Sequence, residues 1–165
     1  MIVMLNISRR QYRLIRAHLF KQDKEQACFL LVNTYINGPV IDLCVKKVYL
    51  IKPEHWDYQS SYHLELNEKV KVRIMMMARR SDCDLIECHS HRGGGVADFS
   101  HSDEHGLDEF LQYVWWKLPG RIYGAMVWTQ SDTTARVWLP KRNIPLGISE
   151  IRITRQRLKK RNVVS

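Results

Sequence analysis

Residues 84–91 read Asp84-Leu85-Ile86-Glu87-Cys88-His89-Ser90-His91, and three consecutive glycines, Gly93 to Gly95, follow one residue later. A short apolar run bounded by turn residues predicts a buried strand that ends in a loop. Beyond the loop, Leu107, Leu111 and Val114 recur at helical spacing, and Pro119-Gly120 ends that helix. The glycines give the loop freedom to turn back over the strand end.

The rest of the chain predicts a mixed α/β fold. We expect helices at 8–20, 67–79 and from about 104 to 118. We expect strands at 27–32, 40–51, 62–66, 84–89, 121–129 and 134–139, a turn at 33–39 and a last edge strand at 147–154. The 165 residues fit one domain, with a mixed β-sheet flanked by helices. This domain is expected to span residues 1–150, followed by a basic tail at 151–165.

The net charge of +9 is unevenly distributed. Residues 151–165 hold six basic residues and no acidic one, which leaves only +3 for residues 1–150. Such a tail is most often solvated and disordered. An alternative function is therefore a nucleic-acid-associated domain whose tail binds phosphates, which salt-dependent binding lost on tail deletion would support.

The compartment is predicted from three absences. The four cysteines form no Cys-x-x-Cys pair, and the N-terminal residues do not resemble a secretory signal. Apolar runs such as 29–32 and 74–78 are far shorter than the roughly 20 residues of a membrane span. We therefore expect a cytoplasmic protein with free thiols and no membrane partner.

Four of the seven histidines lie within seventeen residues: His89, His91, His101 and His105. His89 and His91 are two residues apart on a strand, so their side chains leave the same face and can meet one metal ion. A catalytic zinc ion takes three protein ligands and keeps one position for water. Asp103, at the start of the following helix, is the favoured third ligand, with His101 as the alternative.

These residues resemble a known motif. The segment from residue 89 to residue 103 is similar to the JAMM motif of the JAB/MPN metalloproteases, His-x-His-x(7)-Ser-x-x-Asp. It reads His89-Ser90-His91, then eight further residues, then Ser100-His101-Ser102-Asp103. The family's distant glutamate precedes the first core strand, as Glu25 does here. The sequence departs from the family motif in two ways. The spacer between His91 and Ser100 has eight residues instead of seven, which the glycines can absorb, and Arg92 replaces the proline that commonly follows the second histidine. We expect Arg92 to contact an acidic group of the substrate.

The resemblance implies a single JAB/MPN-like, cytidine-deaminase-like domain that binds a zinc ion through His89, His91 and Asp103. It also implies that Glu25 is the general base and acid, and that Ser100 steadies the oxyanion. The implied activity is hydrolysis of peptide or isopeptide bonds at the C-terminus of a ubiquitin-like protein, in processing or in deubiquitinase-like deconjugation. Some bacterial members are encoded with a ThiF-type activating enzyme, which is then a possible partner.

Two further alternatives stay open. Glu87 is a rival to Glu25 as catalytic acid, although two residues of strand place it about 7 Å deeper in the sheet than His89. A non-catalytic MPN-like scaffold would share the fold, but the presence of the complete residue set favours an enzyme. In the enzyme, the extended tail of the substrate would add to a sheet edge by main-chain hydrogen bonds.

Overall fold

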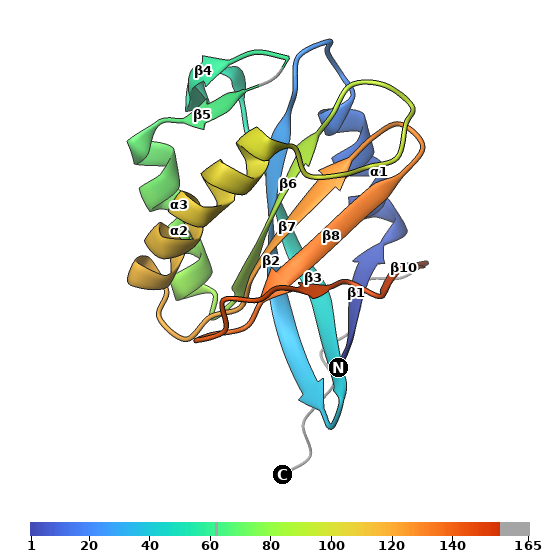
Figure 1. Cartoon of the computed structure of the whole chain (residues 1–165), viewed down its shortest axis with the longest axis vertical. Helices are drawn as coiled ribbons and strands as arrows, with labels where there is room; N and C mark the ends of the chain where they lie inside the picture. The colour runs from blue at the N-terminus through green and yellow to red at the C-terminus, as the bar shows by residue number, and fades with distance from the viewer. Residues whose placement is uncertain (62, 156–165) are drawn as a thin grey trace.

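The computed structural model describes residues 1–61 and 63–155 (Figure 1). Its helices are α1 (Arg9–Leu19), α2 (Glu68–Arg80) and α3 (His101–Lys117), with a single 3-10 turn at Pro53–His55. The strands are β1 (Ile2–Ser8), β2 (Ala27–Asn37), β3 (Val40–Leu50), β4 (Trp56–Gln59), β5 (Leu64–Leu66), β6 (Asp84–Ser90), β7 (Tyr123–Trp128), β8 (Thr133–Trp138), β9 (Leu146–Gly147) and β10 (Glu150–Thr154). The predicted mixed α/β class is confirmed.

Eight strands of the described chain form one mixed sheet in the order β10-β1-β3-β2-β6-β7-β8-β9. β6 lies at its centre, antiparallel to β2 and parallel to β7. β1, a strand that was not predicted, runs parallel to β3. Its buried side chains, Val3, Leu5 and Ile7, alternate with period two and face the core. The expected turn at 33–39 is also wrong, because β2 continues to Asn37 and the chain reverses at Gly38, whose φ is +56°.

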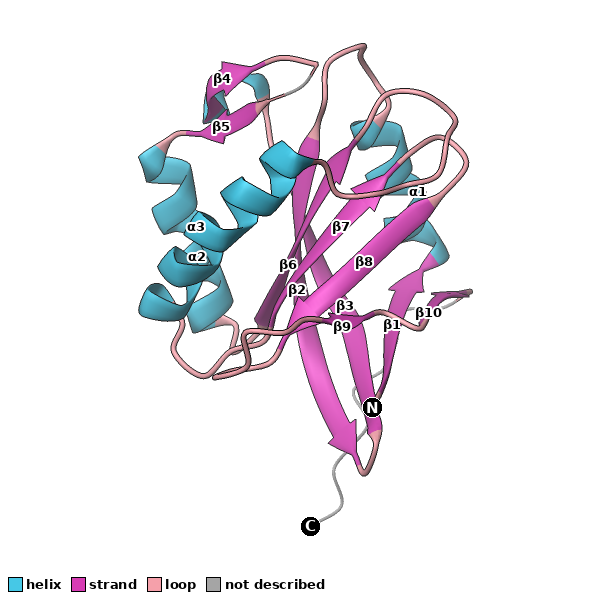
Figure 2. Cartoon of the chain, viewed as in Figure 1, coloured by secondary structure: helices cyan, strands magenta, loops and turns pink. Residues whose placement is uncertain are grey.

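The helices cover both faces of the sheet. Figure 2 shows α2 and α3 together on one side and α1 on the other. Ile15 and Leu19 of α1 pack in one core cluster with Leu5 and Cys88, whereas Val70 of α2 and Leu111 of α3 pack in the second. The continuous apolar run of β2 serves both clusters, since Cys28 faces one and Phe29 the other.

β4 and β5 form a small antiparallel hairpin that is separate from the main sheet. Along the chain it lies between β3 and α2. The strand predicted at 62–66 is observed as Leu64–Leu66, and Tyr62 lies outside the described residues. β4 was not predicted. Its four residues are too few to show a clear period.

The edge strand predicted at 147–154 is divided between the two edges of the sheet. β9 pairs with β8, and β10 pairs with β1 in parallel. The chain crosses between them at two consecutive residues, where Ile148 N donates to Ala135 O at 2.9 Å and Ser149 N donates to Val3 O at 2.8 Å. The sheet therefore curls until its edges meet.

The folded unit continues to Thr154, four residues into the segment assigned to the basic tail. Residues 156–165, which hold four of the six basic residues of that tail, lie outside the described residues. None of the described helices combines the length and apolar character that crossing a membrane requires.

Candidate metal centre

The end of β6 brings two imidazoles together. His89 is buried and His91 half-buried, and their Nε2 atoms lie 3.2 Å apart. His91 follows the last residue of β6, and its backbone N–H donates to the carbonyl of Trp128 on β7 at 2.8 Å. The period of the strand and the neighbouring strand therefore fix both rings on one face, as predicted.

The first turn of α3 supplies the third side chain. Asp103 Oδ1 lies 3.2 Å from Nε2 of His89, and its Oδ2 lies 3.0 Å from Nε2 of His91. The donor atoms of these three residues all lie within 4.8 Å of one another, so they could hold a metal ion. His101 is exposed and does not belong to the group, because two residues of helix turn it about 200° from Asp103. The alternative with His101 as third ligand is therefore wrong.

Ser100 holds Asp103 in place through a reciprocal cap. The backbone N–H of Asp103 donates to Ser100 Oγ at 3.1 Å, and the backbone N–H of Ser100 donates to Asp103 Oδ2 at 2.7 Å. This capping box fixes the carboxylate on the helix end. Ser100 is exposed, so an oxyanion role for its hydroxyl stays a prediction.

Glu25 lies beside the group and outside it. It precedes β2, and the register that pairs Ala27 with His89 brings it to the same end of the sheet. Its Oε1 lies 4.0 Å from Nε2 of His91, and only 8% of the residue is exposed. The β4–β5 hairpin fixes its backbone, because Glu25 N donates to Ser60 O at 3.2 Å and Gln59 Nε2 donates to Glu25 O at 2.8 Å.

Burial and neighbouring charges act in opposite directions on the ionisable groups of the site. Burial raises the pKa of Glu25 to about 6, while the charges of His89 and His91 act against that shift. Burial would also raise the pKa of Asp103, but hydrogen bonds with both imidazoles bring that pKa far below its usual range. Burial would lower the pKa of His89, and the bond to Asp103 reverses the direction. The pKa of Asp103 is thus lowered and that of Glu25 is raised, so the two carboxyl groups of the site differ widely in acidity.

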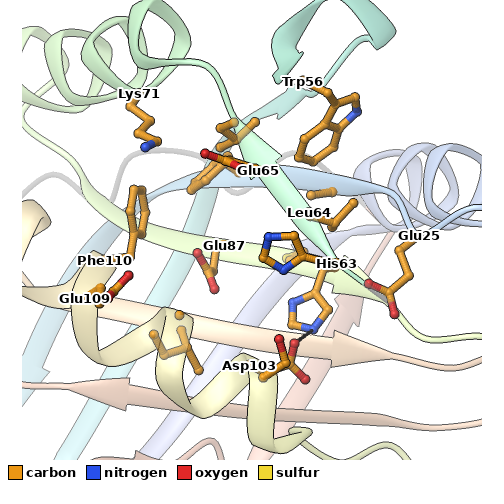
Figure 3. Close-up of a pocket in the computed structure, with 18 of the residues that line it drawn as sticks. Glu25, Trp56, His63, Leu64, Glu65, Lys71, Glu87, Asp103, Glu109 and Phe110 are labelled. Atoms are coloured by element: carbon orange, nitrogen blue, oxygen red, sulfur yellow. Dashed lines mark ion pairs between the residues drawn. The ribbon is translucent and has the colours of Figure 1, made fainter. Parts of the chain in front are cut away.

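A cavity of about 490 Å³ opens beside these residues. Glu25, His89 and Asp103 line one end of it, and α3 and the β4–β5 hairpin form its walls (Figure 3). Glu87 also lines the cavity. It shares the sheet face of His89, in agreement with the strand period.

The loop at 91–99 is fastened to the turn between β7 and β8. Ala97 N donates to Asp132 Oδ2 at 2.8 Å, and Thr129 Oγ1 donates to Gly95 O at 2.8 Å. Arg92 forms an ion pair with Asp23 at 3.1 Å and so has an acidic partner within this chain, not only the one expected on a substrate. These partners were not predicted, since no local pattern indicates which residues meet across 30 or more positions.

Comparisons with known proteins add little. No family model matches the chain, and no curated protein matches it. The chain is similar to the solution structure of a protein from Salinibacter ruber (strain DSM 13855), with 16% sequence identity, over 92% of this chain and 91% of that chain, at a TM-score of 0.45. Similarity at this level supports no statement about family or activity.

Proposed function

We propose that the protein is a zinc-dependent metalloprotease of the JAB/MPN type, with the cytidine-deaminase-like fold of that family. It would hydrolyse peptide or isopeptide bonds at the C-terminus of a ubiquitin-like protein. One observation carries the proposal: His89, His91 and Asp103 converge from a strand end and a helix start, with Glu25 4.0 Å from His91.

The donor set fits a zinc ion. The Nε2 atoms of His89 and His91 lie 3.2 Å apart, and Oδ2 of Asp103 lies 3.0 Å from Nε2 of His91. Tetrahedral ligands at about 2.0–2.1 Å from zinc lie about 3.3 Å from one another, which is close to both of these distances. Two imidazole nitrogens and a carboxylate are also a donor combination that zinc prefers. These residues would hold a zinc ion that would supply Lewis acidity and lower the pKa of a bound water toward about 7.

Three residues of this chain would then have separate roles in the reaction. Glu25 is buried beside the group and held by the hairpin, so its Oε1 can take up a proton and deliver it to the leaving amine nitrogen. Asp103 would stay anionic and serve as the third ligand beside the two imidazoles. Ser100, at the cap of α3, would donate its hydroxyl to the developing oxyanion.

The shape of the cavity suits an extended polypeptide tail. Its wall includes Leu64, Glu65 and Leu66, which make up β5. The small sheet has only two strands, so β5 has one edge without a strand partner in the described chain. A substrate tail could pair with this edge through main-chain hydrogen bonds and reach the metal ligands. Precursor processing and deconjugation are both compatible, and a ThiF-type activating enzyme is the partner that the resemblance suggests.

Zinc content and cleavage of a ubiquitin-like fusion protein test the proposal together. The wild type should hold one zinc ion per chain and cleave the fusion. Glu25→Gln should keep the zinc and lose cleavage, whereas His89→Ala should lose both. His105→Ala is the matched control, because His105 is exposed on α3, outside the metal group, and its ion-pair partner among the described residues is Glu109 at 3.6 Å. A wild type that holds no zinc after purification without chelators would overturn the proposal.

A further inference from the structure

The cavity extends beyond the metal ligands to a carboxyl group that the proposed reaction does not use. Glu87 and His89 lie two residues apart on β6, so Glu87 points from the same face about 7 Å further along the strand. Figure 3 shows its carboxylate inside the cavity, between the metal end and the aromatic wall. No ion pair joins Glu87 to another described residue.

The surroundings of Glu87 are largely apolar. Its lateral neighbours in the sheet are Phe29 on β2 and Ala125 on β7. The ring of Phe110 packs 6.2 Å from that of Phe29 and 5.9 Å from that of the fully buried Tyr123. An ionised carboxylate in this position is costly unless a cation faces it.

The side chains that line this part of the cavity are suited to bind a cation next to Glu87. Trp56, Phe110 and Tyr113 supply aromatic faces, and two further acids, Glu65 and Glu109, line the cavity (Figure 3). The lining contains one lysine, Lys71, whose Nζ is 3.5 Å from Glu68 and is thus paired elsewhere. Aromatic faces around a carboxylate form the usual receptor for a guanidinium or ammonium group.

We infer that this part of the cavity is a subsite for a basic side chain, arginine or lysine, of the polypeptide substrate, with Glu87 as its counter-charge. The inference rests on the proposed function, because it takes the metal end as the place of bond cleavage. A tail bound in an extended conformation repeats every two residues over about 7 Å, the separation of His89 and Glu87. The basic residue therefore lies two positions before the scissile residue.

Cleavage of peptides that differ at this one position tests the inference. With the zinc-loaded wild type, arginine should give a kcat/KM roughly tenfold or more above that of glutamine, as expected for a charge-assisted hydrogen bond, and glutamate should be poorest. Glu87→Gln should abolish the preference while zinc content and thermal unfolding stay those of a folded protein. Glu150→Gln, on the distant strand β10, is the matched control and should keep the preference. Equal cleavage of all three peptides by the wild type would overturn the inference and leave the proposed function standing.

Measurements of peptide binding distinguish the proposed function from the basic subsite if no peptide is cleaved. Fluorescently labelled forms of the same peptides are used. The Glu25→Gln variant loaded with zinc should bind the peptide with arginine more tightly than the peptide with glutamine, as measured by fluorescence anisotropy. That difference should vanish in the Glu25→Gln, Glu87→Gln double variant. Absence of cleavage by the wild type counts against the proposed function, whereas equal affinity for the two peptides refutes the basic subsite.

Discussion

Ser90 and Gln26 join the two strands that carry the site through a reciprocal pair of hydrogen bonds. The backbone N–H of Gln26 donates to Ser90 Oγ, and the backbone N–H of Ser90 donates to the carbonyl of Gln26, both at 3.0 Å. Both residues are buried. Since Ser90 lies between His89 and His91 and Gln26 follows Glu25, this pair fixes the distance between the metal group and the proposed base.

Ser90→Ala should therefore weaken the site and the fold together. The Gln26 N–H would lose its buried acceptor, which costs roughly 1–3 kcal/mol in the free energy of unfolding. We expect zinc to be retained and kcat to fall more than KM changes, because Glu25 loses its position. Urea denaturation and steady-state kinetics measure the two effects. Ser131→Ala, which removes an exposed hydroxyl bonded to Gly94 O, should change neither. A Ser90→Ala enzyme as stable and active as wild type would contradict the assignment.

Replacing Ser100 distinguishes its capping role from the proposed oxyanion role. Ser100→Ala removes the cap of α3 and should cost about 1 kcal/mol of stability and weaken zinc binding through Asp103. Ser100→Asp restores a capping acceptor, so stability should return. A carboxylate has no proton to donate to an oxyanion, so kcat should stay low in Ser100→Asp. Full recovery of kcat in that variant would show that Ser100 acts only as a cap.

Arg136 is expected to be a positioning residue for the metal group. Its guanidinium lies 2.5 Å from Glu104 Oε2 and 4.0 Å above the ring of Phe99, which in turn packs edge-on against His89 at 6.4 Å. Arg136→Leu should weaken zinc affinity by less than the roughly tenfold that loss of a direct hydrogen bond to a ligand costs, because Arg136 acts through Phe99. Arg136→Lys should restore part of the affinity. Competition with a chromophoric chelator measures this without activity. Arg152→Leu on β10 is the control, and equal affinities for both leucine variants would exclude the role.

His18 should make the stability of the fold depend on pH. It is buried on α1, and its Nε2 lies 2.8 Å from the carbonyl of Ala27. Burial lowers its pKa below 6.5, the hydrogen bond to Ala27 opposing this in part. The unfolded chain then binds a proton near pH 6.5 that the folded chain does not. The free energy of unfolding therefore carries this contribution above pH 6.5 and loses it as the pH falls.

The comparison of wild type with His18→Gln isolates that effect. Glutamine can also donate to the Ala27 carbonyl but does not titrate, so the variant should lose less stability between pH 7.5 and pH 5.5. Urea denaturation in the presence of a chelator at both pH values measures the difference. Identical pH dependence in both proteins would show that His18 is protonated equally in the folded and unfolded states.

The predictions from sequence succeeded where the signal was local. The helices at 8–20 and 67–79 and the strand pair at 121–129 and 134–139 are observed within one or two residues, because each has its own apolar period and stop signals. β1 has a period of two and could have been recognised. The edge strand expected at 147–154 is observed as β10, but its division from β9 was not predicted. β4 and β9 could not be recognised, since strands of two to four residues depend on the partners they meet.

The sequence by itself determined the chemistry of the candidate site. The spacing of His89 and His91 on a strand and of Asp103 at a helix start predicts three donors that can face one point. Only the tertiary structure decided what surrounds them. The register of Ala27 with His89 brings Glu25 within 4.0 Å of His91, and the phase of α3 turns His101 away. The packing around β6 also leaves Glu87 on the cavity wall without an ion pair among the described residues. The period of the apolar residues can be recognised in the sequence, whereas strand register and burial arise only when strands that are distant in sequence pack together.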